Sequence, residues 1–273
     1  KFGGETDNWM YPRHTGDFSV FRVYCSPDGK PAAYSPQNIP YTPKRFVPIS
    51  NQGYQEGDYA MILGNPGSTD RYLTSWGVTN RVNSGNKARI EIRGAKQDVW
   101  RKYMRENEAI NIAYAGKYAR SSNYWKNSIG MNNAIEHLKV VEQKEKKQAE
   151  FTAWVNSNPD RIKKYGNVLK QLEDNYNTIY PYGRAMNYLR ESLFAGVELP
   201  RIANNAKMAV KGKNLSTDSL LKKTNEIYKD YYPQVDEATF TALLEAYKKS
   251  VDADALPEIY TTIDKKFKGD YAK

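Results

Sequence analysis

The sequence predicts an α+β fold in which a β-type segment precedes a large, mainly α-helical domain. Two apolar runs with strand character, residues 18–25 and 58–64, lie in the first quarter of the chain. Five prolines fall between residues 31 and 48, where they argue for extended loop and edge segments. From about residue 70 onward, apolar residues have the spacing typical of helices. This change of pattern divides the chain into residues 1–67 and 68–273.

The β-type segment has clear local signals but little material for a core. The run FSVFRVYC ends at the single cysteine, Cys25, so we expect a buried thiol there. The next residues, SPDGK, are typical of a turn, and a second turn cluster, NPGS, follows residue 64. About 65 residues with so few strands bury little apolar surface. We therefore expect these strands to pair with segments outside this chain, which also opens without Met.

The helical domain is predicted from apolar residues three and four positions apart. The clearest case is residues 236–250, where four such positions follow one another. Asn158 before Pro159 predicts a helix start, and Ser216 predicts another in a segment that Pro233 ends. We expect helices around residues 99–104, 110–118, 134–155, 159 onward, 169–176, 216–232 and 236–250.

Charge and composition exclude several classes of function. The net charge is +10, but Lys and Arg alternate with Glu and Asp along the helices, so we expect no nucleic-acid binding. No stretch approaches the roughly 20 apolar residues of a membrane span. One cysteine and two distant histidines predict no metal site, and no phosphate or dinucleotide loop predicts a cofactor. The 22 tyrosines fit either wet clefts and interfaces or the edges of a core.

Some polar and aromatic residues have simple local interpretations. Asp17 follows a glycine and precedes an apolar run, which fits a turn acceptor before a strand. Asn123 follows two serines, which fits a helix cap. Trp9 and Trp125 fit a hydrophobic core. The residues alone therefore permit an enzyme without requiring one.

Three longer blocks carry more information than single residues. They are GGETDNWMYPRHTGDFSVFRVY at residues 3–24, ILGNPGSTDRYLTS at residues 62–75 and YARSSNYWKNSIGM at residues 118–131. Together they resemble a family of bacterial serine dipeptidyl peptidases, the dipeptidyl-peptidase 7 and 11 group. The blocks fall in both predicted segments, so the resemblance extends over the chain.

The resemblance implies a chymotrypsin-like double β-barrel with a Ser-His-Asp triad and an inserted helical domain over the active site. Residues 1–67 would then be part of the second barrel, and residues 68–273 most of the helical domain, cut short at its C-terminal end. Asp17, in the family's Thr-Gly-Asp-Phe motif, would be the triad aspartate. The family's histidine and serine motifs are not found here, so we expect the chain alone to be inactive.

The resemblance also assigns residues that recognise the free amino group of a peptide. An asparagine–tryptophan pair and an asparagine of the helical domain do this in the family, and the matching positions are Asn8, Trp9 and Asn123. The implied partners are peptides with a free N-terminus, and no cofactor is needed. The resemblance further implies a homodimer in the periplasm or outside the cell.

A non-catalytic reading stays open beside this one. The chain could be a helical binding module with a β stalk that holds a partner through its basic, tyrosine-rich surface. The two hypotheses differ in where they place three residues. Convergence of Asn8, Trp9 and Asn123 favours the peptidase, whereas an Asn123 far from the other two favours the binding module.

Overall fold

The computed structural model describes most of the chain, namely residues 8–12, 14, 19–61, 63–64, 67–68, 70–203, 207 and 216–272. The chain divides into two units, one of Lys1–Gly4 and Arg13–Arg71 and the other of Glu5–Pro12 and Tyr72–Lys273. The segment around Asn8 thus groups with the helices rather than with the loops that follow it. The assignment of residues 1–67 and 68–273 to a barrel and an inserted domain stays a prediction.

The first unit consists of extended loops and one short antiparallel pair. Strand β1 (Tyr24–Cys25) pairs with β2 (Ile39–Pro40), so that Cys25 lies opposite Ile39. The predicted turn follows β1 directly, with Gly29 at φ +79° and its N–H donating to the Ser26 carbonyl. Cys25 is 5% exposed, which confirms the expected buried thiol. Local turn chemistry therefore sets the register of this pair.

The two longer strands predicted for this unit are not formed among its described residues. Only the end of the run at residues 18–25 enters a ladder, and the described part of 58–64 enters none. The physical reason is that a strand needs a neighbour for its backbone groups and a cover for its apolar face. Among the described residues of this unit neither is present for these two runs, and large apolar side chains are exposed, among them Phe21, Tyr59 and Leu63. The barrel stays a prediction.

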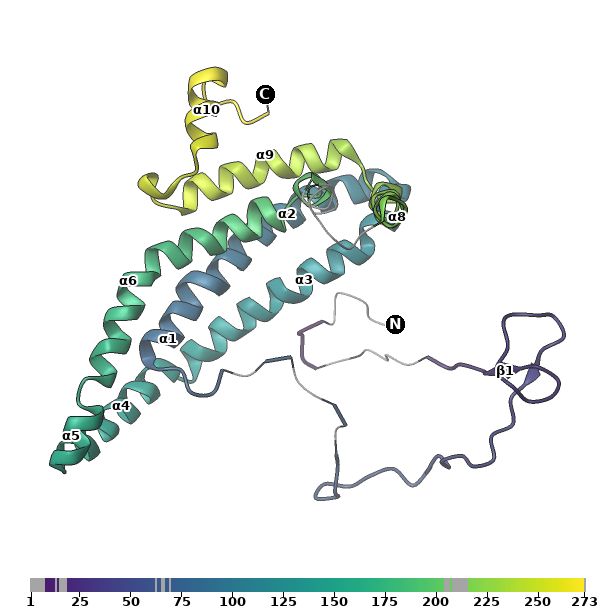
Figure 1. The fold of residues 1–273 in the computed structure, drawn as a ribbon, viewed down its shortest axis with the longest axis horizontal. Coiled ribbons are helices and arrows are strands. Elements are labelled where there is room, and N and C mark those ends of the chain that lie inside the picture. The colour runs from purple at the N-terminus through teal and green to yellow at the C-terminus, as the bar shows by residue number, and fades with distance from the viewer. Residues whose placement is uncertain are drawn as a thin grey trace. The chain divides into compact units, whose positions relative to one another are not determined.

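The second unit is built almost entirely from helices (Figure 1). The first helices run without interruption through a π-helical stretch from α1 into α2. The elements are α1 (Ser75–Asn80), η1 (Arg81–Asn86), α2 (Lys87–Glu106), α3 (Glu108–His137), α4 (Val140–Asn156), α5 (Pro159–Tyr165), α6 (Val168–Leu189), η2 (Arg190–Phe194), α8 (Thr217–Lys229), α9 (Pro233–Ser250), η3 (Ala253–Ala255) and α10 (Glu258–Phe267).

Helix starts with a strong capping residue are confirmed. Asn158 accepts the backbone N–H groups of Asp160 and Arg161 at the start of α5. Ser216 accepts the N–H of Ser219 at the start of α8. Each cap satisfies backbone donors that have no partner inside the helix. The predicted helix at residues 236–250 is also confirmed as most of α9.

The prediction of one continuous helix over residues 134–155 is wrong. The pattern indicated a single helix over residues 134–155, but α3 ends at His137 and α4 begins at Val140. Lys139 lies between them in the left-handed conformation, at φ +50°. The N–H of Lys139 donates to the carbonyl of Glu136, which tightens the last turn and redirects the chain. Neither Gly nor Pro marks this site, so periodicity alone could not reveal it.

Helix α2 is the centre of the packing, with α3 and α9 as its main neighbours. One core cluster joins Ile92 of α2 to the buried residues of the other helices, and a second surrounds Trp100. The remaining members of the first cluster are Ala88, Tyr188, Val197, Leu243, Leu244, Tyr247, Val251, Tyr260 and Ile263, and those of the second are Ile110, Tyr114 and Val235.

Several tyrosines belong to this core and keep their hydroxyl groups bonded. Tyr188 donates to Glu91 Oε2 at 2.6 Å, and Tyr260 donates to the Leu244 carbonyl at 2.9 Å. Burial raises the pKa of both phenols, so they stay neutral donors at physiological pH. Part of the tyrosine excess is therefore structural.

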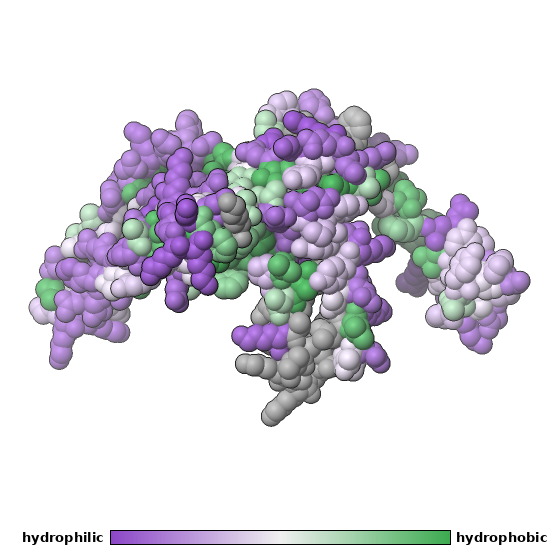
Figure 2. Space-filling view, turned by 90° about the horizontal axis from the view of Figure 1, so that it is seen from above, coloured by the Kyte–Doolittle hydropathy of each residue, from purple (hydrophilic) through white to green (hydrophobic). Residues whose placement is uncertain are grey.

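Hydrophilic side chains dominate the surface of the helical unit, with smaller hydrophobic patches between them, as Figure 2 shows. Among the described residues, no helix combines the length and the apolar character needed to cross a bilayer. This surface agrees with helices that bury one face and expose charged side chains on the other.

Gly196 allows the packing against α9 to be tested, with Gly116 as its control. A methyl group on Gly196 would lie 2.0 Å from the Ser192 carbonyl oxygen and 2.4 Å from Leu243 Cδ1. We predict that Gly196→Ala lowers the free energy of unfolding by about 1–3 kcal/mol, as overpacking does. Gly116→Ala, on α3, meets no atom within 4 Å and should leave stability unchanged or raise it. Urea unfolding followed by circular dichroism measures both; equal effects would contradict the packing.

Candidate functional site

Three residues from distant parts of the sequence meet on helix α3. Asn123 lies in the middle of α3, and its side-chain oxygen accepts two hydrogen bonds. Asn8 donates from Nδ2 at 3.1 Å, and Trp9 donates from Nε1 at 2.9 Å. The predicted residues Asn8, Trp9 and Asn123 therefore form one cluster, although 115 positions separate Asn8 from Asn123.

Asn123 is not a helix cap, contrary to its simplest local interpretation. Helix α3 is capped by Asn107, whose side chain accepts the N–H of Ile110 at 3.1 Å. Backbone groups in the middle of a helix bond to one another. The amide of Asn123 is thus not needed by the backbone of α3 and can serve the contact with Asn8 and Trp9.

Trp9 is not a core residue, because its side chain is 53% exposed. Its backbone has φ +58°, a left-handed conformation that costs a bulky residue about 1–3 kcal/mol. The hydrogen bond to Asn123 holds the indole, and about half of the residue stays accessible to solvent. Conformations of this kind concentrate at functional sites, where the surroundings hold them in place.

Trp125 is half-buried rather than a core residue, and it links two helices. Its indole N–H donates to the carbonyl of Ile90 at 2.9 Å, which links α3 to α2. Arg93 adds a second link, because its guanidinium donates to the carbonyl of Ser121 at 3.4 Å. These two bonds fix the part of α3 that carries Asn123.

The cluster consists of neutral amides and an indole, so it suits binding rather than proton transfer. Amide oxygens accept hydrogen bonds, amide and indole N–H groups donate them, and none of these groups titrates near neutral pH. A carbonyl oxygen has two lone pairs, and both N–H donors at Asn123 are directed to the same oxygen. The predicted catalytic residue, Asp17, lies outside the described residues.

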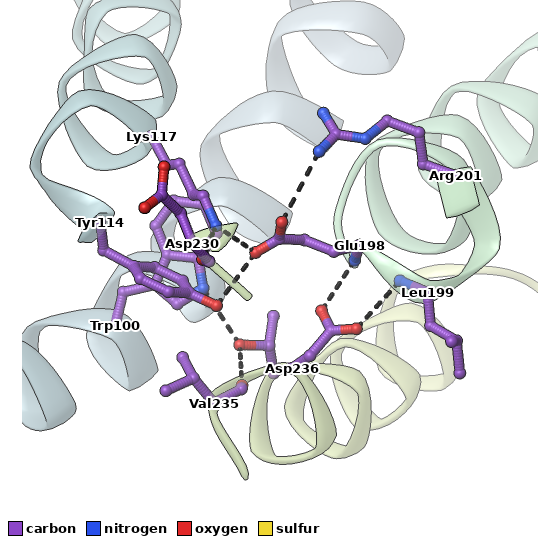
Figure 3. Close-up of polar contacts among 10 residues, drawn as sticks. Trp100, Tyr114, Lys117, Glu198, Leu199, Arg201, Asp230, Val235 and Asp236 are labelled. Carbon is purple, nitrogen blue, oxygen red and sulfur yellow. Dashed lines mark hydrogen bonds and ion pairs between the residues drawn. The ribbon is translucent and has the colours of Figure 1, made fainter. Parts of the chain in front are cut away.

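A second polar cluster, around Glu198, was not expected from the sequence (Figure 3). Its carboxylate accepts the hydroxyl of Tyr114 at 3.0 Å and the ammonium of Lys117 at 2.7 Å. The backbone N–H groups of Glu198 and Leu199 donate to the Asp236 carboxylate at 2.7 and 3.0 Å. This network joins α3, α9 and the segment after η2.

Electrostatics around Glu198 indicate a structural network. Burial, followed by the charge of Glu198, raises the pKa of Tyr114 far above its usual value. Tyr114 therefore stays a neutral donor at every physiological pH. The partners of Glu198 lie 81 and 84 residues away in the sequence, and no local motif marks them. Among the described residues, no group of His, Cys, Asp and Glu could hold a metal ion.

Comparison with known proteins identifies the family of the chain. The family model for peptidase S46 matches residues 1–273. The chain is 48% identical to dipeptidyl-peptidase 7 of Porphyromonas gingivalis, over 100% of the chain and 38% of that protein. It is 38% identical to the Asp/Glu-specific dipeptidyl-peptidase of Flavobacterium psychrophilum, over 94% of the chain and 37% of that protein.

A solved structure extends the comparison. The crystal structure of Porphyromonas endodontalis DPP11 in complex with the dipeptide Arg-Glu matches with a TM-score of 0.75 and 35% identity. The match covers 100% of this chain and 40% of that one, so the chain spans about two fifths of the relatives it matches. The resemblance seen in the sequence is confirmed, and the chain belongs to the peptidase S46 family.

Proposed function

We propose that the protein carrying this chain is a dipeptidyl aminopeptidase that releases dipeptides from the free N-termini of peptides. The relatives named dipeptidyl-peptidase support this activity, and the chain covers only part of their length. The observation that carries the proposal is the meeting of Asn8, Trp9 and Asn123 on α3. Their convergence favours a peptidase over a helical binding module, which does not require it.

The cluster would bind the α-ammonium group of the substrate. An ammonium ion has three N–H donors and no acceptor, so it needs oxygen atoms around it. Asn8 and Asn123 each carry an amide oxygen, and the half-exposed Trp9 ring offers an apolar wall or a cation–π face. Since Asn123 Oδ1 already accepts two N–H groups, the ammonium replaces one of them or binds the Asn8 oxygen.

Such a site fixes the number of residues between the N-terminus of the substrate and the bond that is cleaved. When the terminal ammonium is fixed on α3, only one peptide bond of an extended chain reaches the catalytic group at a given distance, because each residue spans about 3.3 Å. A blocked N-terminus has lost the charge and two of the three donors. The cluster would therefore separate free from blocked peptides and set the cleavage position.

For the chemical step, we propose a serine mechanism in which Asp17 orients the catalytic histidine. Its carboxylate would accept the Nδ1–H of the imidazole and stabilise the imidazolium that forms when the serine attacks. The histidine, the serine and the rest of a chymotrypsin-like barrel would come from parts of the protein outside this chain. A homodimer in the periplasm or outside the cell completes the proposal.

Replacing Asn123 tests the binding role. In the full protein we predict that Asn123→Ala lowers kcat/KM for free dipeptidyl substrates by about 10- to 100-fold, the effect of losing a hydrogen bond to a charged group worth about 1.5–3 kcal/mol. The loss should be much smaller for N-terminally blocked substrates. Steady-state assays on matched free and acetylated peptides measure it.

Asn111 provides the matched control for this test. It lies on the same helix with an exposed side chain, so Asn111→Ala removes an amide of the same size away from the cluster. This variant should keep its discrimination between free and blocked peptides. If Asn123→Ala keeps that discrimination as well, the amine-binding role is wrong.

Replacing Asp17 tests the mechanism separately. We predict that Asp17→Asn lowers kcat by about 10⁴-fold with little change in KM, because the amide no longer holds the histidine in its reactive tautomer. The control is Asp28→Asn, an exposed carboxylate in the turn after β1. Burst and steady-state kinetics measure kcat. Activity of Asp17→Asn within tenfold of the parent protein would reject the triad assignment.

A further inference from the structure

A basic pocket of about 300 Å³ lies in the helical unit between α2, α3 and the segment after η2. Its lining includes the cations Arg93 and Lys96 of α2, Lys117 and Arg120 of α3, and Arg201. Among the described lining residues there is one carboxylate, Glu198. Five positive side chains therefore face one negative side chain, an imbalance that a binding partner of opposite charge would correct.

Three of the five cations lie beside carboxylates, although these carboxylates number only two, Glu198 and Glu191. Lys117 lies 2.7 Å and Arg201 3.6 Å from the Glu198 carboxylate. Arg93 lies 2.8 Å from Glu191, behind the pocket wall. Within the described ranges, neither Lys96 nor Arg120 has a carboxylate within 4.0 Å. Lys96 and Arg120 are thus the two pocket cations without an adjacent carboxylate in that part of the chain.

A buried lysine normally has a carboxylate beside it, and among the described residues Lys96 has none within 4.0 Å. It is 4% exposed, and its ammonium nitrogen has one long contact, 3.4 Å to the carbonyl of Ala195, and lies 4.9 Å from the Trp100 ring. Burial, followed by repulsion from Arg93, lowers the pKa of Lys96 to about 8. A buried ammonium with poorly satisfied donors is costly unless an acceptor binds it.

Ser121 gives an independent sign of a ligand in the same pocket. It lines the pocket from α3, is 3% exposed, and its buried hydroxyl has no hydrogen-bond partner in the described part of the chain. Ser121 shares one face of the helix with Lys117, four residues earlier. Buried hydroxyl groups almost always have a partner, so the missing one is expected to come from a bound molecule.

We propose that this pocket binds an oxyanion, held between Lys96, Arg120 and the hydroxyl group of Ser121. Lys96 supplies a desolvated charge, Arg120 an exposed planar guanidinium, and Ser121 a hydroxyl donor, which together suit a carboxylate or a tetrahedral anion. The charge of Glu198 is offset by Lys117 at 2.7 Å and Arg201 at 3.6 Å, which limits its repulsion of the ligand. The inference goes beyond the proposed peptidase activity and does not depend on it.

Two sources could supply the oxyanion: a free inorganic ion or a carboxylate of a peptide. Tyr124, which follows Asn123 on α3, also lines the pocket, with Arg93 5.0 Å from its ring centre. The pocket and the Asn123 cluster are therefore presented by neighbouring residues of one helix. This position makes a peptide carboxylate a natural ligand, and the experiment separates it from an inorganic ion.

Isothermal titration calorimetry on the full protein tests the pocket with two probes. One is inorganic sulfate, and the other is N-acetyl-glutamate amide, with N-acetyl-glutamine amide as its uncharged match. Neither glutamate probe has a free amine, so the Asn123 cluster does not contribute. We expect binding that is at least tenfold weaker in Lys96→Met and in Arg120→Gln. Lys102→Met removes an exposed charge from α2 outside the pocket and should bind as the parent protein does.

The outcomes distinguish the sources. Binding of sulfate that depends on Lys96 identifies a site for free oxyanions, and binding of only the glutamate probe identifies a site for peptide carboxylates. No binding of either probe, or equal losses in Lys96→Met and Lys102→Met, overturns the proposal. Arg120→Gln changes an exposed side chain, so it keeps the test valid if Lys96→Met unfolds.

The charge state of Lys96 gives a pH dependence. The groups around it are Arg93 on α2, Glu191 in η2 and Glu198. An anion binds the protonated form, so affinity is full below pH 8 and falls as the pH rises through 8. We predict about tenfold weaker sulfate binding at pH 9 than at pH 7, from the fraction of protonated lysine. Constant affinity over this range would exclude Lys96 as the ligand.

Discussion

The two hydrogen bonds that converge on the side-chain oxygen of Asn123 are the constraint on which the proposed site depends. They hold Asn8 and Trp9 against α3 and keep Trp9 in a left-handed backbone conformation. Asn123 is itself placed by the packing of α3 on α2, where Trp125 bonds to the carbonyl of Ile90. The helical core therefore supports the site through a short chain of hydrogen bonds that runs from α2 through α3 to Asn8 and Trp9.

Three carboxylates of the helical unit, Glu198, Asp236 and Glu191, are committed to structural contacts, and this commitment shapes the electrostatics around them. Glu198 satisfies Tyr114 and Lys117, Asp236 holds two backbone N–H groups, and Glu191 neutralises Arg93. The chain has a net charge of +10, so among the described residues some Lys and Arg side chains near these paired carboxylates stay without a neutralising partner charge. The positive charge of the pocket at Lys96 thus follows from these pairings. It makes the pocket-lining residues of α2 and α3 attractive to anions.

Sequence patterns predicted the features that local chemistry determines. The starts of α5 and α8 follow from Asn158 and Ser216, which satisfy the backbone of their own helices. The break at Lys139 was not predictable, because neither Gly nor Pro marks its left-handed backbone. The absence of strand pairing in the described part of residues 58–64 was not predictable either, because pairing needs a neighbouring strand that local sequence does not reveal. The cluster of Asn8, Trp9 and Asn123 is equally non-local, and only the resemblance to a known family pointed to it; local chemistry alone favoured a cap and a core residue.

Helix α3 carries groups that bind a cation close to groups that bind an anion. A peptide can carry both charges, so this arrangement suits it better than a simple cation or a simple anion. Amide oxygens near residue 123 recognise a positive group without adding a negative charge, so they do not neutralise the cations of the adjacent pocket. Within the strongly basic helical unit, a free ammonium group binds only where specific acceptors replace its water. An acidic group is drawn to Lys96 and Arg120 by charge. A ligand with a positive terminus and a negative group would satisfy both.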